Sequence, residues 1–163
     1  MKKGLLLLFV LAAFILAGCA GGGASNGPAK EPVVLKLNAA DAALKTDGNL
    51  VIGDTSAGVK VVAWWEKTTD EVSWDLNVDK AGKYTVSVKI SMDPQFPGSV
   101  VGVTIGSEEL EFTVPDTGAW ESFKILDIGV VDLKKGTVPV LVKAKSVKNR
   151  FVCNLEYVSL TAQ

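Results

Sequence analysis

Apolar and polar residues alternate in short runs along most of this chain. A period of two is clear in residues 72–78, 84–90, 101–105, 110–114 and 138–142. Successive side chains of a strand point to opposite faces, so this alternation predicts strands that are buried on one face only. Valine and isoleucine are frequent in these runs, as pleated surfaces favour. The pattern therefore predicts a protein built mainly of β-strands.

Turn-forming residues separate these runs, among them Asp47-Gly48, Pro97-Gly98 and Lys134-Lys135-Gly136. The best helical segment, residues 39–45, is at most two turns long. Strands at this spacing with almost no helix predict an all-β fold, an antiparallel β-sandwich of the jelly-roll type. Pro139 lacks a backbone N–H, so we expect it on an edge strand.

The first eighteen residues have the pattern of an export signal. Lys2 and Lys3 precede an uninterrupted apolar run from Leu5 to Leu16. A secretory signal peptide typically has this order of a positively charged start, an apolar core and then small residues. The apolar run is also shorter than the ~20 residues that span a bilayer. The segment Leu16-Ala17-Gly18-Cys19 resembles the lipobox of bacterial lipoproteins. That resemblance implies cleavage after residue 18 and lipidation of Cys19.

Residues 19–32 would then be the lipidated cysteine and a flexible tether. Residues 20–32 are small and polar with two prolines, so they bury little apolar surface. Thirteen such residues have a root-mean-square reach of roughly 20 Å. We expect a folded domain of residues 33–163, held at the membrane of the cell envelope by the N-terminal lipid. Ala20 after the cysteine favours the outer membrane if the bacterium has two membranes.

Composition excludes several kinds of chemistry. The sequence contains no histidine, so neither a Ser-His-Asp nor a Cys-His nucleophile can be assembled. With Cys19 lipidated, Cys153 has no partner for an internal disulfide, and its apolar surroundings indicate a buried side chain. The formal net charge is −1, without a basic stripe, which argues against a nucleic-acid partner.

Short motifs in the predicted domain resemble a known family. They are Asp70–Trp74 followed by Ala81–Val86, then Val114–Trp120, and finally Asn154–Leu160. In this order the segments resemble the carbohydrate-binding modules of families 6 and 35. The resemblance implies a galactose-binding-like jelly roll and a ligand that is a poly- or oligosaccharide.

The resemblance also implies which residues contact the sugar. The tryptophan of the family's "TGxW" matches Trp120, and the asparagine of its "NLDY" matches Asn154. A second aromatic side chain comes from the segment before residue 70, where Trp64 and Trp65 are the nearest matches. Because adjacent strand residues face opposite ways, at most one of the pair should be a core residue, and we favour Trp65 as the one that faces the sugar. An aromatic ring suits the apolar face of a pyranose, and an amide suits its hydroxyls.

Members of these families often hold a structural calcium ion with acidic residues. The family's opening "EAE" is replaced here by Asn38-Ala39-Ala40, followed by Asp41, and the aspartate of "NLD" by Glu156. Calcium prefers several oxygen ligands with carboxylates among them. We therefore expect no cofactor, and the structural calcium that the resemblance would allow is disfavoured.

Three functions remain open from the sequence. The first is non-catalytic glycan binding by a membrane-anchored lipoprotein, which could serve a partner enzyme that acts on glycosides. The alternative is a structural or adhesive envelope lipoprotein that uses the same sandwich without a sugar ligand. A glycosidase would need two flanking carboxylates, and the cluster Glu108, Glu109 and Glu111 has the pattern of a solvated strand face. We expect no enzyme activity.

The lipid anchor can be tested directly. Cys19→Ser removes the thiol that would carry the lipid, so the precursor should stay uncleaved by the lipoprotein peptidase and should take up no label from radioactive palmitate. Wild type should be labelled and shortened. Palmitate incorporation into the variant would show that Cys19 is not the lipidated residue.

Overall fold

The strands form where the alternation predicts them. The computed structural model describes residues 31–163, and over this part of the chain it is all-β. The elements are β1 (Val34–Asn38), the 3-10 turn η1 (Ala39–Asp41), β2 (Ala43–Lys45), β3 (Val51–Asp54), β4 (Lys60–Ala63), β5 (Glu71–Val78), β6 (Gly82–Ser91), β7 (Val100–Ile105), β8 (Glu108–Thr113), β9 (Lys124–Leu133), β10 (Gly136–Ser146) and β11 (Asn154–Ala162).

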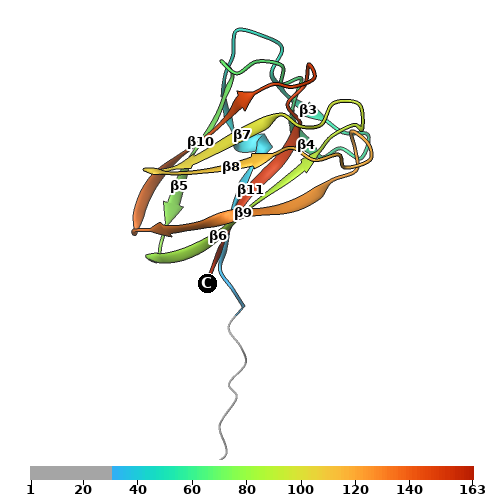
Figure 1. Cartoon of the computed structure of the whole chain (residues 1–163). Helices are drawn as coiled ribbons and strands as arrows, with labels where there is room; N and C mark the ends of the chain where they lie inside the picture. The colour runs from blue at the N-terminus through green and yellow to red at the C-terminus, as the bar shows by residue number, and fades with distance from the viewer. Residues whose placement is uncertain (1–30) are drawn as a thin grey trace, which may run out of the picture. The chain divides into compact units, whose positions relative to one another are not determined.

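Two antiparallel sheets pack face to face (Figure 1). The six-stranded sheet has the order β3-β4-β11-β6-β9, and β1 also pairs with β11. The five-stranded sheet has the order β2-β5-β10-β7-β8. Strands that are distant in sequence lie next to each other, so the sandwich depends on long-range pairing. The predicted antiparallel β-sandwich is confirmed.

The core lies between the two sheets and uses the apolar phase of each strand. On β5 the side chains of Val72, Trp74, Leu76 and Val78 are buried, while Asp75 and Asn77 are exposed. The buried aromatic residues also satisfy their polar atoms. Trp74 Nε1 donates to the carbonyl oxygen of Asn38 at 2.9 Å, and the Tyr84 hydroxyl donates to the carbonyl of Lys80 at 2.5 Å. Both residues therefore have the structural role that their strand phase predicts.

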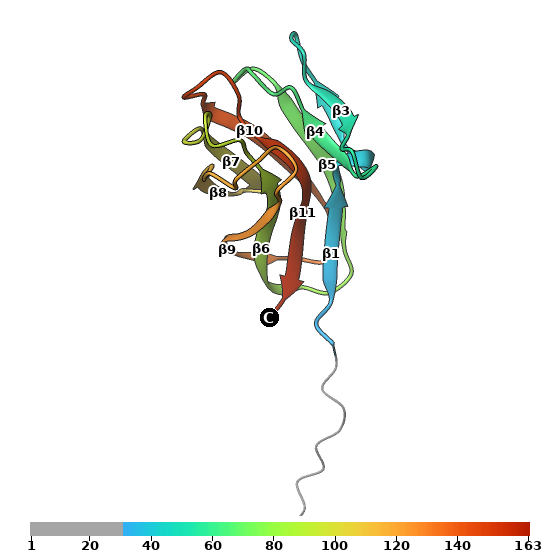
Figure 2. The ribbon, with the colours of Figure 1, turned by 90° about the vertical axis from the view of Figure 1, so that its right-hand side faces the viewer.

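The two ends of the described chain lie at one end of the sandwich (Figure 2). The backbone N–H of Ala162 donates to the carbonyl oxygen of Val33 at 2.9 Å, which joins the start of the domain to its last strand. The predicted signal peptide, Cys19 and residues 20–30 of the predicted tether lie outside the described residues. None of the helices in the described part of the chain is long and apolar enough to cross a membrane.

Two local predictions are wrong. Residues 39–45 form the turn η1 and then strand β2, because Ala39 is fully buried and Leu44 pairs with Val72 of β5. Pro139 lies on β10, which is a central strand between β5 and β7. The carbonyl oxygen of Pro139 accepts a hydrogen bond from Gly106, at the turn beyond β7. The nitrogen of Pro139 points to the same side, so no bond to β5 is lost.

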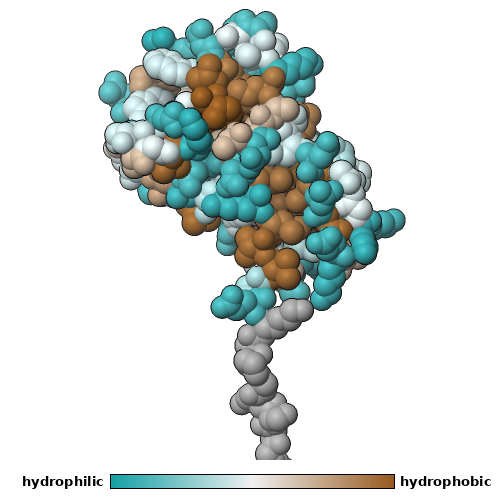
Figure 3. Space-filling model, turned by 180° about the vertical axis from the view of Figure 1, so that it is seen from behind, coloured by the Kyte–Doolittle hydropathy of each residue, from teal (hydrophilic) through white to brown (hydrophobic). Residues whose placement is uncertain are grey.

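Six large apolar side chains are exposed in the described part of the chain. They are Val33, Val34, Val51, Trp64, Ile125 and Val130. On the face drawn in Figure 3, apolar areas are separated by polar side chains. Trp64 is the one large aromatic side chain among the six.

Trp64 and Trp65 leave the end of β4 in opposite directions. Trp65 is 1% exposed and its Nε1 donates to the carbonyl of Lys67 at 3.1 Å, whereas Trp64 is 59% exposed. Trp64 has a φ of 55°, in the left-handed region, and this turns the chain so that Trp65 enters the core. The prediction that one of the pair is a core residue is confirmed. The preference for Trp65 as the one facing the ligand is wrong.

The two tryptophans should therefore differ in their contribution to stability. Trp65→Ala should lower the free energy of unfolding by about 3–5 kcal/mol, because it leaves a large cavity in the core. Trp64→Ala should change it by no more than about 1 kcal/mol, because an exposed side chain is removed. Denaturant titration of both variants measures this difference. Equal losses would contradict the assignment of burial.

The thiol of Cys153 should be unreactive in the folded protein. Its side chain is 3% exposed, and burial raises the pKa of Cys153 to about 12, so almost no thiolate exists at pH 8. In a chain that starts at Ala20, Cys153 is the only cysteine. An aromatic disulfide reagent at pH 8 should label it negligibly until denaturant unfolds the domain. Rapid, complete labelling under native conditions would contradict this prediction.

Candidate functional site

An open cleft of about 550 Å³ lies at the end of the sandwich where β11 begins. Four segments supply its walls: the β3–β4 hairpin, the residues after β4, the β8–β9 loop and the β10–β11 loop. The lining residues are Asp54, Thr55, Val61, Ala63, Trp64, Trp65, Trp120, Glu121, Arg150, Phe151, Cys153 and Asn154. The chain enters the domain at the opposite end, because β11 runs from Asn154 at the cleft to Ala162 beside Val33.

Three aromatic side chains dominate the cleft. The ring of Phe151 lies 6.1 Å from that of Trp64 at an interplanar angle of 69°, and 5.5 Å from that of Trp120 at 88°. Phe96 stacks on Trp120 at 5.9 Å and also meets Phe151 edge to face at 5.2 Å. Each distance is within the favourable range for aromatic pairs. Phe151 is thus the ring that connects the two indoles.

The cleft brings together the residues that the sequence predicted. Trp120 and Asn154 line it, and so do both Trp64 and Trp65. Trp120 is partly exposed, as predicted for a residue that faces a ligand. Trp65 lines the cleft from within the core, so Trp64 is the second exposed indole. The predicted convergence at one end of the sandwich is confirmed.

Asn154 positions the loop that carries Trp120. Its Nδ2 donates to the backbone carbonyl oxygen of Trp120 at 3.0 Å, and the hydroxyl of the buried residue Ser91 donates to the same oxygen at 2.5 Å. Thr117, in the same loop, accepts from the backbone N–H of Met92 at 2.7 Å. These bonds tie the β8–β9 loop to β6 and β11. The loop is therefore held in place before any ligand arrives.

The indole N–H groups divide the tryptophans into two kinds. Those of Trp65 and Trp74 donate to backbone carbonyls. Those of Trp64 and Trp120 make no hydrogen bond with any residue from 31 to 163. Buried indoles normally satisfy this donor, whereas one at a binding surface keeps it available. Trp64 and Trp120 thus offer both an apolar ring and a free donor.

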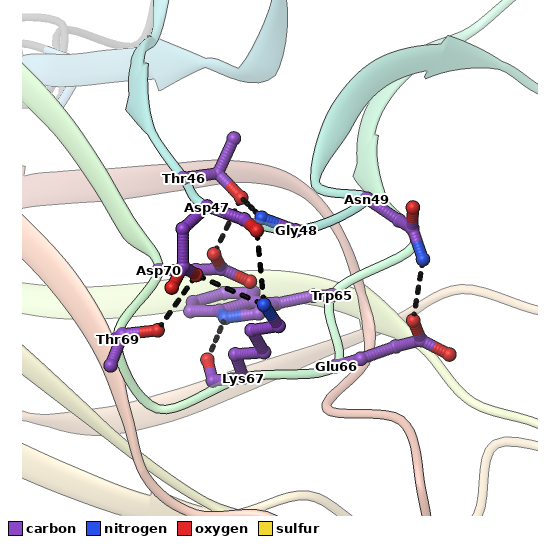
Figure 4. Close-up of polar contacts among 9 residues, drawn as sticks. All are labelled: Thr46, Asp47, Gly48, Asn49, Trp65, Glu66, Lys67, Thr69 and Asp70. Carbon is purple, nitrogen blue, oxygen red and sulfur yellow. Dashed lines mark hydrogen bonds and ion pairs between the residues drawn. The ribbon is translucent and has the colours of Figure 1, made fainter.

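A polar network surrounds Trp65 and the residues that follow it (Figure 4). Lys67 Nζ donates to the carbonyl oxygen of Asp47 at 3.0 Å and to its carboxylate at 3.2 Å, and Thr46 donates to Asp70 at 2.6 Å. The pKa of Asp47 is lowered, first by its hydrogen bond from Lys67. The network joins the β2–β3 loop to the β4–β5 loop and so fixes the backbone that carries Trp65.

Glu66 links this network to the cleft. Asn49 Nδ2 donates to Glu66 Oε2 at 2.9 Å, and Arg150 Nε donates to Glu66 Oε1 at 3.0 Å. These two hydrogen bonds, Asn49 first, lower the pKa of Glu66. The guanidinium carbon of Arg150 also lies 4.8 Å from the centre of the Phe151 ring. Arg150 therefore holds Phe151 and the segment after β4 together.

Sequence reasoning missed Phe151, Arg150, Glu121 and Asp54. Phe151 belongs to the apolar run Phe151-Val152-Cys153, which has the pattern of a buried strand. Its position three residues before Asn154 is the signal that could have identified it. Glu121 and Arg150 lie in loops without periodicity, and Asp54 is the last residue of the short strand β3, so no pattern distinguishes them from other surface charges.

The side chains considered as calcium ligands already interact with other side chains of the protein. Asn38 Nδ2 lies 3.4 Å from Asp41 Oδ2, and the carboxylate of Glu156 binds Lys89 Nζ at 2.7 Å. Within residues 31–163 there is no group of three histidine, cysteine, aspartate or glutamate residues arranged to hold a metal ion. Glu109 and Glu111 both pair with Lys145 on the five-stranded sheet and lie outside the cleft.

The fold is similar to that of solved carbohydrate-binding modules. A family 35 module from Clostridium thermocellum has a TM-score of 0.64 at 18% identity, over 82% of this chain and 100% of that module. The C-terminal CBM6 of the laminarinase LamC from Zobellia galactanivorans has a TM-score of 0.65 at 19% identity, over 79% and 99% of the two chains.

A third similar structure contains a sugar. It is the carbohydrate-binding module CBM6cm-2 of Cellvibrio mixtus lichenase 5A in complex with cellotriose, with a TM-score of 0.61 at 18% identity over 82% of this chain and 99% of that one. Identities this low show the fold alone. The fold is therefore that of a carbohydrate-binding module.

The family of the chain is also shown. No curated protein matches the chain. Residues 49–163 match the family described as a domain of unknown function, DUF5077, and this range includes β3 to β11 and every residue of the cleft. Because the match covers well over half of the chain, this protein belongs to the DUF5077 family.

Proposed function

We propose that this protein binds a glycan in the cleft without catalysing a reaction. The observation that carries the proposal is the convergence of Trp64, Trp120 and Phe151 beside Asn154 in one open cleft. A pyranose has an apolar face of C–H groups and a rim of hydroxyls. Aromatic rings contact the first, and amide and indole groups hydrogen-bond the second. The cleft offers both kinds of contact.

The rings form a connected aromatic surface on which a sugar can pack. Phe151 contacts both Trp64 and Trp120 edge to face, at 6.1 and 5.5 Å between ring centres. Asn154 uses its Nδ2 on the Trp120 carbonyl, and its Oδ1 can still accept a hydrogen bond from a hydroxyl. A single site of this kind should bind with a dissociation constant of about millimolar to micromolar.

The charges of the cleft support binding over hydrolysis. A glycosidase needs one carboxylic acid with a raised pKa to protonate the leaving group. Of the two acids in the cleft, Asp54 is paired with Lys60 at 2.7 Å, and the pKa of Glu121 is lowered by its hydrogen bonds from Ser56. The environment of Glu121 favours the carboxylate, which is the wrong form for a general acid, and Asp54 is held in an ion pair with a lysine.

The alternative of an adhesive or structural lipoprotein without a sugar ligand would leave the exposed indoles unexplained. Trp64, which is 59% exposed, adjoins Phe151 and Trp120 in one open cleft, and a clustered apolar area of this kind is expected at a binding site. The fixed loop of Trp120 is also expected of a binding site more than of an inert surface.

We also propose that the domain is anchored in the cell envelope through a lipid on Cys19. The tether would join the domain at Val33, at the end opposite the cleft. The cleft would then lie at the end of the domain opposite the point where the tether joins it. A partner enzyme in the same envelope could act on a glycan held there.

Trp64→Ala should abolish most glycan binding and leave the fold intact. A chain from Ala20 to Gln163 is applied to a glycan array, and the affinity for the best neutral oligosaccharide is measured by titration calorimetry. Loss of an aromatic–sugar contact should weaken binding about tenfold or more, which is about 1.4 kcal/mol. Denaturant titration should show little change in stability.

Ile125→Ala is the matched control, because Ile125 is also 59% exposed but does not line the cleft. It should keep the affinity of wild type. If no glycan binds wild type, or if Trp64→Ala binds as well as Ile125→Ala, the proposed function fails.

A further inference from the structure

The β3–β4 hairpin forms one wall of the cleft but is attached to its sheet by few contacts. Asp54 and Thr55 of the hairpin line the cleft. Among residues 31–163, β3 pairs only with β4, and β4 pairs with β11 at one position, Val62 with Leu155. In contrast, β11 pairs with β6 along almost its whole length. The sheet alone therefore places little constraint on the tip of this hairpin.

The turn at the tip of the hairpin closes on itself. The backbone N–H of Thr55 donates to the carbonyl oxygen of Val59 at 3.0 Å, and that of Gly58 donates to the carbonyl oxygen of Thr55 at 2.9 Å. The Thr55 hydroxyl accepts from the backbone N–H of Val59 at 3.1 Å. These bonds shape the turn but do not attach it to another segment. In the described part of the chain, the hydrogen bonds that leave this turn all go to Glu121.

Glu121 connects the turn to the β8–β9 loop, which forms another wall of the cleft. Its carboxylate accepts a hydrogen bond from the backbone N–H of Ser56 at 2.7 Å and another from the Ser56 hydroxyl. The side-chain and then the backbone hydrogen bond from Ser56 lower the pKa of Glu121, so it is ionised at neutral pH. Hydrogen bonds to an ionised acceptor are stronger than those between neutral groups. Ser56 and Glu121 thus form a bridge between two walls.

The loop that carries Glu121 is itself fixed to the sandwich. The carbonyl oxygen of the preceding residue, Trp120, accepts from Ser91 and from Asn154. The hydroxyl of Thr117, earlier in the loop, accepts from the backbone of β6 at 2.7 Å. Glu121 therefore extends from a supported segment to one that has little support of its own.

We propose that Glu121 is a positioning residue, which holds the β3–β4 hairpin at a fixed distance from Trp120 and so keeps the cleft in the shape that a sugar fits. The inference rests on the proposed glycan binding. A site whose walls are ordered before binding loses less conformational entropy than one that the ligand must order. Without the bridge, the wall at Asp54 and Thr55 would move relative to Trp120, and the affinity for the glycan would fall.

Two variants of Glu121 separate the bridge from the charge. Glu121→Gln removes the charge but keeps the length, and its amide can accept from the N–H of Ser56 and donate to the Ser56 hydroxyl. Glu121→Asp keeps the charge but is one methylene shorter, so it should not reach Ser56. In titration calorimetry with the best glycan from the array, Glu121→Gln should bind about threefold or more tightly than Glu121→Asp. The reverse order would show that the charge acts on the ligand and would overturn the inference.

Changes at Ser56 alter the bridge from the other side, outside the lining of the cleft. Ser56→Ala removes one donor, and Ser56→Pro removes both. Proline is favoured at the second position of a turn such as Thr55 to Gly58. The affinity should fall stepwise from wild type through Ser56→Ala to Ser56→Pro. Ser122→Ala is the control, because it changes an exposed serine that also lies outside the lining, and it should bind as wild type does.

The bridge can also be measured without a glycan. In amide hydrogen exchange followed by NMR, the N–H of Ser56 should be protected in wild type and in Glu121→Gln, and should exchange fast in Glu121→Asp. The melting temperatures should agree within a few degrees, because Ser56 and Glu121 are both exposed. A change of affinity at unchanged stability is expected of a positioning role and not of a general loss of structure.

The possible failures are distinguishable. If the N–H of Ser56 exchanges as fast in wild type as in Glu121→Asp, or if Ser56→Pro binds the glycan as tightly as Ser122→Ala, the positioning role is wrong while glycan binding stands. If no glycan binds wild type, the proposed function fails, and the effect of the bridge on affinity fails with it.

Discussion

The pairing of β11 with its neighbours is the constraint on which both the sandwich and the cleft depend. One edge of β11 pairs with β1 at Val34 to Asn38 and with β4 at Val62, and the other edge pairs with β6 along almost its whole length. This strand therefore joins the start of the domain to its end. Its first residue, Asn154, holds the carbonyl of Trp120. A change in the register of β11 would move the amide that fixes the loop and the strands that close the core.

Two residues in left-handed conformation shape the cleft beside this strand. Trp64 has a φ of 55° and Arg150 a φ of 68°. For a residue other than glycine this conformation costs about 1–2 kcal/mol, and the surrounding structure must offset it. The backbone N–H of Val152 donates to the carbonyl oxygen of Trp65 at 2.8 Å, so the two turns are joined immediately behind the strained residues. Burial of Trp65 and Val152 offsets the strain. Because Trp65 is buried, the ring of the preceding residue, Trp64, points to the solvent.

The alternation of apolar residues was sufficient to predict the sandwich because most strands are buried on one face. The alternation did not predict the cleft, because there the regular exchange of buried and exposed positions is interrupted. Val61 and Val62 are both buried on β4, so the alternation no longer tells which of the next two tryptophans faces inward. Trp64 adopts a left-handed backbone conformation, which only a glycine at that position would have indicated in the sequence. Pro139 was also predicted incorrectly. A central strand can accept a proline when the proline nitrogen faces a neighbour that does not need its hydrogen bond, and the sequence does not show which neighbour the nitrogen faces. Phe151 was missed because its role comes from three rings contributed by distant loops.

Glu156 shows how this chain differs from what its resemblance to calcium-binding modules implies. The carboxylate at this position is 14% exposed on its side chain and binds Lys89 Nζ at 2.7 Å. The same ammonium lies 5.5 Å from the ring centre of Phe123 and 5.7 Å from that of Tyr157, and Lys36 lies 3.9 Å from Tyr157. A cation that belongs to the protein thus neutralises the acid, and aromatic rings stabilise that cation. Binding a metal ion here would first require the displacement of Lys89, which would leave an ammonium partly buried without a partner. The fold of a carbohydrate-binding module is therefore compatible with an internal ion pair at this position, and the loops at the cleft can differ independently of it.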